Sequence, residues 1–118
     1  MYAGSDLLVM PSMFEPCGLC QLVALKYGTV PIVRACGGLG DTVADRDYSW
    51  APAGQRNGYV FHHCDHQALE SAMARAIGLW HGYPEDFRYL MLNGMRRDRS
   101  WARPGQDYQN IYDYVRHK

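Results

Sequence analysis

Two short runs of consecutive apolar residues, at positions 7–10 and 30–33, constrain the fold of this chain more than any other feature. Runs of this length and character are typical of strands that are buried on both faces of a parallel sheet. Between them, apolar side chains recur at helical spacing over residues 19–27, and Gly28 stands where a glycine often follows a helix. The pattern predicts a β-α-β unit over residues 7–33, a connection that is right-handed in nearly all known proteins.

Glycine, proline and aspartate mark the boundaries of the next elements. Residues 37–40 predict a flexible glycine turn, after which Asp41 and Thr42 can cap a short helix. Residues 45–58 are polar and rich in turn-forming residues, which indicates a surface loop before a third strand at residues 59–61.

Three helices are predicted after the third strand, each from a start signal and an apolar stripe. Asp65 caps the first, Pro84 opens the second and Pro104 opens the last. Their stripes are Leu69, Ala72, Met73, Ala76, Ile77 and Trp80; then Phe87, Leu90, Met91 and Met95; and finally Tyr108, Ile111, Tyr112 and Val115. The helices over residues 84–118 are expected to form a C-terminal helical tail.

The predicted order of elements gives the fold class α/β, with a short parallel sheet of about three strands and flanking helices. This is half of a doubly wound, Rossmann-like sheet, and one edge of such a half would lie open. Residues 1–6 also read as a helix end and a turn that lead directly into a buried strand. We therefore expect Met1 to be an internal methionine and the chain to be a fragment of a longer protein.

Charge and hydropathy exclude several classes of function. Lys and Arg number 12, as do Asp and Glu, so the chain lacks the basic excess of a general nucleic-acid binder. No apolar run approaches the roughly 18 residues of a membrane-spanning helix, and no secretion signal is visible. We expect no nucleic-acid or membrane partner, a cytoplasmic location, and reduced thiols at Cys17, Cys20, Cys36 and Cys64.

The segment from Pro11 to Leu19 joins the first strand to the first helix and carries the residues best suited to ligand binding. Ligands of open α/β sheets bind beyond the carboxyl ends of the strands, where this loop lies. Glu15 supplies a carboxylate for sugar hydroxyls, and Gly18 permits a ligand to approach the backbone closely. The helix start at Leu19 and Cys20 offers unpaired N–H groups to a phosphate. These residues predict a site for a nucleotide sugar or sugar phosphate, with a purely structural turn as the alternative.

A second glycine loop, Gly37-Gly38-Leu39, follows the second strand. Because the carboxyl ends of parallel strands share one edge of the sheet, we expect it beside the first loop. Two such loops on neighbouring strand ends favour a functional interpretation of both.

The order of these motifs resembles that of bacterial glycogen synthases and plant starch synthases over essentially the whole chain. The most specific parts are Phe14-Glu15-Pro16-Cys17-Gly18-Leu19 and the later Gly37-Gly38-Leu39-x-Asp41-Thr42-Val43. The similarity also includes Tyr2-Ala3-Gly4-Ser5-Asp6, Gln21-Leu22, Lys26-Tyr27-Gly28-Thr29-Val30-Pro31, Asn57-Gly58-Tyr59-Val60-Phe61 and Ser100-Trp101.

The resemblance implies the two-domain GT-B fold, with the active site between two Rossmann-like domains. It implies transfer of glucose from ADP-glucose or UDP-glucose to an α-1,4-glucan with retention of configuration and no cofactor or metal. Glu15 would contact the donor glucose as the candidate catalytic residue, and the backbone of Cys17, Gly18 and Leu19 would hold the glucose hydroxyls. The N–H groups near Leu19 and Cys20 would face the donor diphosphate.

Three departures limit what this chain can do. Related glycosyltransferases carry a second glutamate where Val23 stands, although glycogen synthases commonly lack it. Cys20 replaces a frequent threonine and is a weaker hydrogen-bond donor. The family's phosphate-binding arginine and lysine lie upstream, and Arg34 is expected only at the rim. Residues 1–118 are therefore expected to be a partial donor-binding domain that is inactive without its missing N-terminal domain.

Other interpretations remain open. Cys17 and Cys20 form a C-x-x-C at a helix start, which is also typical of thiol-disulfide redox proteins. The segment His62-His63-Cys64-Asp65-His66 suggests a metal site, but a second cluster of ligands is absent. A non-catalytic remnant that binds little is the third alternative.

Overall fold

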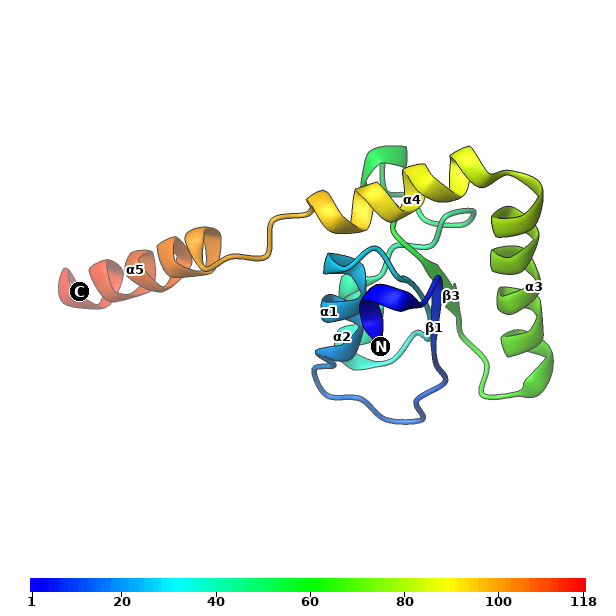
Figure 1. Cartoon of the computed structure of the whole chain (residues 1–118). Helices are drawn as coiled ribbons and strands as arrows, with labels where there is room; N and C mark the ends of the chain where they lie inside the picture. The colour runs from blue at the N-terminus through cyan, green and yellow to red at the C-terminus, as the bar shows by residue number, and fades with distance from the viewer.

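The computed structural model describes residues 1–118 and confirms an α/β fold around one three-stranded parallel sheet (Figure 1). Two short 3-10 helices, η1 and η2, accompany the regular elements. The elements are η1 (Tyr2–Gly4), β1 (Leu7–Met10), α1 (Cys20–Lys26), β2 (Val30–Arg34), α2 (Gly37–Thr42), η2 (Ala53–Gln55), β3 (Tyr59–Phe61), α3 (His66–Gly82), α4 (Pro84–Arg96) and α5 (Ala102–Arg116). All three predicted strands are present, in the spatial order β1-β2-β3.

The sheet is covered on both faces, which is why its strands are short and continuously apolar. In Figure 1, α1 and α2 lie on one side of the sheet and α3 lies on the other, while α4 passes over the sheet and contacts both α1 and α3. The central strand β2 pairs with β1 through Val9 and Ile32, and with β3 through Val33 and Val60. The outer edge of β1 pairs with no strand, as the sequence predicts for half of a doubly wound sheet.

The hydrophobic core is divided between the two faces of the sheet. The larger part joins β2 and β3 to α3 and α4 and consists of Val30, Ile32, Tyr59, Phe61, Ala72, Ala76, Leu79, Phe87 and Leu90. The smaller part lies under α2 and consists of Val33, Leu39 and Val43. Successive side chains of a strand point to opposite faces, so Ile32 and Val33 belong to different parts of the core.

Several local signals in the sequence are confirmed. Gly28 has a φ of 85° directly after α1, a left-handed conformation that favours glycine at a helix end. The Asp65 carboxylate accepts a 2.7 Å hydrogen bond from the Ala68 amide and so caps α3. Pro84 occupies the first turn of α4, where its missing N–H costs no helical hydrogen bond.

Two predicted boundaries are wrong. Residues 37–40 are not a flexible turn, because Gly37–Thr42 form α2 with Cys36 as the N-cap. Asp41 and Thr42 therefore end this helix and do not cap its start. The last helix begins at Ala102 and not at Pro104, which fits inside the first turn because N–H groups there have no helical acceptor.

The predicted apolar faces of the helices are only partly buried. In α3, Ala72 and Ala76 are buried as predicted, whereas Ile77 and Trp80 are about half exposed and Leu79 takes the core position instead. In α5 no residue is buried, and the helix extends away from the rest of the chain (Figure 1). The predicted stripe of α5 therefore has no partner within residues 1–118. No helix is both long and apolar enough to cross a membrane.

A buried carboxylate anchors the loop that precedes β3. Asp45 is 6% exposed and accepts hydrogen bonds from the backbone amides of Asp47, Tyr48 and Val60 at 2.8, 3.0 and 2.6 Å. The Arg75 guanidinium of α3 completes the set at 3.0 Å. Burial alone would raise the pKa of Asp45, but the hydrogen bonds from Arg75 and the backbone outweigh it and hold this pKa below its ordinary value.

This arrangement predicts an acid-sensitive fold. Because the pKa of Asp45 is depressed in the folded chain, its stabilisation is present above the ordinary aspartate pKa of about 4 and is lost as pH falls through the folded pKa. Urea unfolding between pH 7 and pH 2.5 measures this loss. We expect Asp45→Asn to flatten the acid limb and to cost about 3 kcal/mol at pH 7, since it removes the buried carboxylate of Arg75 and leaves only the more exposed Asp47 as its ion-pair partner.

The matched control is Asp86→Asn, since Asp86 is exposed and makes a single 3.4 Å contact with Arg46. We expect this surface change to cost less than about 1 kcal/mol and to leave the acid limb intact. Equal pH profiles for the native chain and Asp45→Asn would contradict the assignment to Asp45.

Candidate functional site

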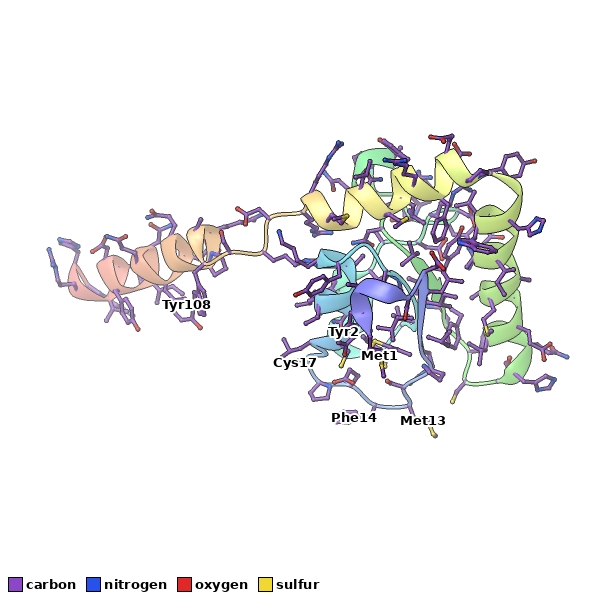
Figure 2. All side chains as sticks on the ribbon, viewed as in Figure 1. Met1, Tyr2, Met13, Phe14, Cys17 and Tyr108 are labelled. Carbon is purple, nitrogen blue, oxygen red and sulfur yellow. The ribbon has the colours of Figure 1, made fainter.

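The loop over residues 11–19 leaves the carboxyl end of β1 and reaches the start of α1, as predicted. Met13 and Phe14 lie at its tip with 77% and 83% of their surface exposed, and Figure 2 shows both at the outer end of the loop. Glu15 is half-buried. The four ion pairs of the chain join Arg46 or Arg75 to Asp45, Asp47 or Asp86, so the Glu15 carboxylate has no cationic partner.

The first turn of α2 supports this loop directly. A Cβ added to Gly37 would overlap the carbonyl oxygen of Glu15, and one added to Gly38 would overlap the carbonyl oxygen of Cys17. Gly37 also has a φ of 46°, in the left-handed region. These two positions can therefore hold only glycine without displacing the loop. The prediction that the two glycine segments lie side by side is confirmed, and their contact is backbone to backbone.

Leu39 has a different role from its two glycine neighbours. Its side chain is fully buried with Val33 and Val43 beneath α2. Its amide hydrogen-bonds to the Cys36 carbonyl at 3.1 Å. Leu39 thus fastens α2 to the sheet, and its side chain is not available to a ligand.

Side chains from β2 tie down the beginning of the loop. Arg34 donates from Nε to the Ser12 carbonyl at 2.7 Å and from Nη2 to the Met13 carbonyl. The Cys36 thiol contacts the same Ser12 oxygen at 3.3 Å. The sequence predicts Arg34 at the rim of the site. In the structure its guanidinium holds the backbone of the loop at Ser12 and Met13.

The end of the loop is held by Gln21, which is fully buried in the first turn of α1. Its side-chain amide donates to the Gly18 carbonyl at 2.8 Å and to the Thr42 hydroxyl at 3.1 Å. Gly18 has a φ of 69°, and a Cβ there would lie 2.7 Å from the Gln21 side chain. Gln21 was not among the predicted site residues. Its signal is helical spacing, because Gln21 shares a face with the buried Ala24 and Leu25.

The start of α1 is open to solvent and has no side-chain cap. Leu19 is the N-cap residue and is 70% exposed, and Cys20 is also exposed. The first N–H groups of a helix have no acceptor within the helix, so these donors remain available at the loop. The neighbouring Cys20 side chain is the main reason that the pKa of Tyr2 lies above its ordinary value.

The thiols are not paired with one another, and the histidines are not grouped around a metal site. Cys17, Cys20, Cys36 and Cys64 are all free. No group of three or more His, Cys, Asp or Glu side chains is placed to hold a metal ion, and this includes the segment from His62 to His66. The predicted site residues that the fold does bring together are Glu15 and Cys17 with Gly37 and Gly38.

Two glycines of the same short helix provide a test of this contact. We expect Gly38→Ala to destabilise the chain by about 1–3 kcal/mol, because the new methyl group forces the loop away from α2. At Gly40 the nearest heavy atom to a new Cβ is 3.8 Å away, so Gly40→Ala is expected to stabilise α2 by up to about 1 kcal/mol. Thermal and urea unfolding measure both changes. The same sign for the two variants would refute the packing described here.

The chain is similar to known proteins over most or all of its length. The family described as glycosyl transferases group 1 matches residues 1–89. The chain is 59% identical to glycogen synthase 2 of Methylococcus capsulatus over 118 residues and 58% identical to glycogen synthase 1 of Nitrosococcus oceani over 115 residues. These alignments cover 100% and 98% of this chain but 24% of each relative. The chain therefore spans about a quarter of their length.

A solved structure shows the same arrangement of elements. The catalytic domain of starch synthase IV from Arabidopsis thaliana, bound to ADP and acarbose, superposes with a TM-score of 0.91 at 38% identity. The match covers 99% of this chain and 24% of the plant chain. The expected fold and family are thereby confirmed, and the chain belongs to the glycosyl transferases group 1, as a C-terminal portion of the glycogen and starch synthase type.

Proposed function

We propose that this chain supplies the donor-glucose loop of a retaining glucosyltransferase that extends an α-1,4-glucan from ADP-glucose or UDP-glucose. The observation that carries the proposal is the contact between the start of α2 and the loop of residues 11–19. Gly37 and Gly38 hold the backbone of Glu15 and Cys17 at the carboxyl edge of the sheet. This edge is where open α/β sheets bind ligands. The Arabidopsis starch synthase IV relative, which superposes on this chain, is bound to ADP and acarbose.

Each part of the loop has a chemical task in this proposal. The Glu15 carboxylate has no cation to neutralise it, so it can accept hydrogen bonds from donor hydroxyls and stabilise positive charge developing on the glucose. The backbone of Cys17, Gly18 and Leu19 would hold the remaining hydroxyls. The open helix start at Leu19 and Cys20 would face the diphosphate and favour its negative charge as the bond to the glucose breaks.

The same proposal assigns the rest of the reaction to parts of the protein outside this chain. Residues 11–19 contain no Lys or Arg, and the side chain of the neighbouring Arg34 is bound to the Ser12 and Met13 carbonyls. The cations opposite the diphosphate and the groove for the acceptor glucan would come from the N-terminal domain. The exposed face of α5, with Tyr108 and Tyr112, would pack against that domain. The compartment that goes with this function is the cytoplasm.

Assays of the isolated chain test whether residues 1–118 need the N-terminal domain for donor binding and transfer. We expect calorimetric titration with ADP-glucose to give a dissociation constant weaker than about 1 mM, because most of the diphosphate contacts are absent. We also expect no incorporation of radiolabelled glucose into glycogen. Sustained elongation of glycogen by residues 1–118 alone would contradict the proposal.

A chimera tests the role of the loop. Residues 1–118 replace the matching quarter of the Methylococcus capsulatus glycogen synthase 2, with which they are 59% identical, and transfer from ADP-glucose is measured. We expect the chimera to be active and Glu15→Gln to lower kcat by at least about 100-fold, as removal of one transition-state contact does in other enzymes. Glu70→Gln, on the exposed surface of α3, is the control and should leave kcat unchanged. Full activity of the Glu15→Gln chimera would refute the assignment.

A further inference from the structure

A polar groove lies at the opposite end of the sheet from the loop of residues 11–19. Two adjoining cavities of about 350 and 280 Å³ share Arg46, Asp47 and Asp86. They lie between the loop that precedes β3 and the helices α3 and α4. We call them together the loop–helix groove. Because β3 is parallel to β1, its beginning lies at the amino edge of the sheet, away from the carboxyl edge that carries Glu15.

The charged side chains around the loop–helix groove are held by partners within the chain. Its cations are Arg46, Arg56 and Arg75, and its anions are Asp47 and Asp86 together with Asp45 behind Arg75. Arg46 is paired with both Asp47 and Asp86, and Arg75 is paired with both Asp45 and Asp47. Arg56 makes no ion pair, but it donates to the Ala51 and Arg46 carbonyls, both at 2.9 Å. Because each of the three arginines already has a partner, the groove favours a neutral ligand with many hydrogen-bonding groups over an anion.

An exposed aromatic ring lies against one of these charges. Tyr48 is 75% exposed, and the Arg75 guanidinium carbon lies 4.8 Å from the centre of its ring. The Tyr48 amide donates to Asp45, which fixes the backbone at the same point. A ring supported by a cation on one side and exposed on the other presents a preorganised apolar surface.

A second aromatic ring lines the groove from α4. Tyr89 is half exposed, and its hydroxyl lies against Gly54 of η2, where an added Cβ would be 3.5 Å away. Asn93 fastens η2 to the same helix through hydrogen bonds of 2.9 and 3.0 Å to the Ala53 and Arg56 carbonyls. Trp50 is fully exposed in the same loop, so the packing of the chain gives no reason for its large apolar ring.

We infer that the loop–helix groove binds a neutral oligosaccharide, separately from the donor loop, and that its ligand is an α-1,4-glucan. A sugar ring has an apolar C–H face, which suits Tyr48 and Tyr89, and a rim of hydroxyls that both donate and accept. Paired Asp and Arg side chains satisfy such hydroxyls from both sides. The choice of glucan rests on the proposed function, whereas the choice of a neutral saccharide rests on the charges and rings of the groove.

The position of the groove leaves it free for a long polymer. Both β1 and β3 are edge strands, but only β3 has an isolated bridge beside it, from Asp45 to Gly58. Tyr59 and Arg75 of the groove belong to β3 and α3, at the edge of the sheet farthest from β1. A protein part that continued the sheet beyond β1 would leave this surface exposed. The groove would thus hold a glucan on the outside of the complete enzyme.

Affinity electrophoresis of the 118-residue chain tests the inference. Native gels are run without polysaccharide and with glycogen, with dextran, or with heparin as an anionic polymer. We expect glycogen to retard the chain and heparin to leave its mobility unchanged. In the double variant Tyr48→Ala/Tyr89→Ala, both sites being exposed, the dissociation constant for glycogen is expected to rise at least fivefold.

Two controls separate this site from the donor loop. Tyr112→Ala removes a ring of similar exposure, 70%, from α5 and should retain full retardation. Glu15→Gln should also bind glycogen normally. The test of the groove therefore does not depend on whether the donor-loop proposal is correct. No retardation by glycogen, equal retardation of the double variant, or retardation by heparin alone would each overturn the inference. Retardation by dextran equal to that by glycogen would overturn the α-1,4 specificity.

Discussion

The candidate site depends on one backbone contact, between the start of α2 and the loop that follows β1. The carbonyl oxygens of Glu15 and Cys17 lie where the Cβ atoms of any other residues at positions 37 and 38 would be. Two segments separated by about twenty residues are therefore packed backbone against backbone. Hydrogen bonds from Arg34 and Gln21 to loop carbonyls then hold the loop in this position.

The division of the core explains why this contact sits where it does. The central strand β2 places Ile32 under α3 and Val33 under α2, so α2 is fixed to the sheet through Leu39 and Val43. A helix anchored in this way can support a loop that makes few apolar contacts of its own. Exposed Met13 and Phe14 show how little of the loop is held by burial.

The sequence was sufficient for the strands and most helix boundaries, because their signals are local. Continuous apolar runs gave the strands, and Asp65 and Pro84 gave two helix starts. It failed at residues 37–40, where glycine suggests a turn by propensity, although tertiary contact with the loop requires glycine inside a helix. It also failed at Ile77 and Trp80, since a helical stripe does not reveal where neighbouring elements end.

The residues of the candidate site were predictable as a set, but their partners were not. Motifs placed Glu15, Gly18 and the later glycines at one edge of the sheet. The hydrogen bonds of Arg34, Gln21 and Thr42 depend on how two loops and two helices pack together. The spacing of residues along the chain does not predict this packing. The network of Asp45 and Arg75 was missed for the same reason, because 30 residues separate the partners.

The detached position of α5 has a consequence for its motions. A helix of 15 residues with no buried side chain receives no stabilisation from packing, and helices of this length are marginal in water when alone. The amide hydrogens of residues 102–116 would therefore exchange with solvent almost as fast as those of an unfolded peptide, while β2 exchanges only on global unfolding. The stability of α5 thus depends on a packing contact that the rest of residues 1–118 does not supply.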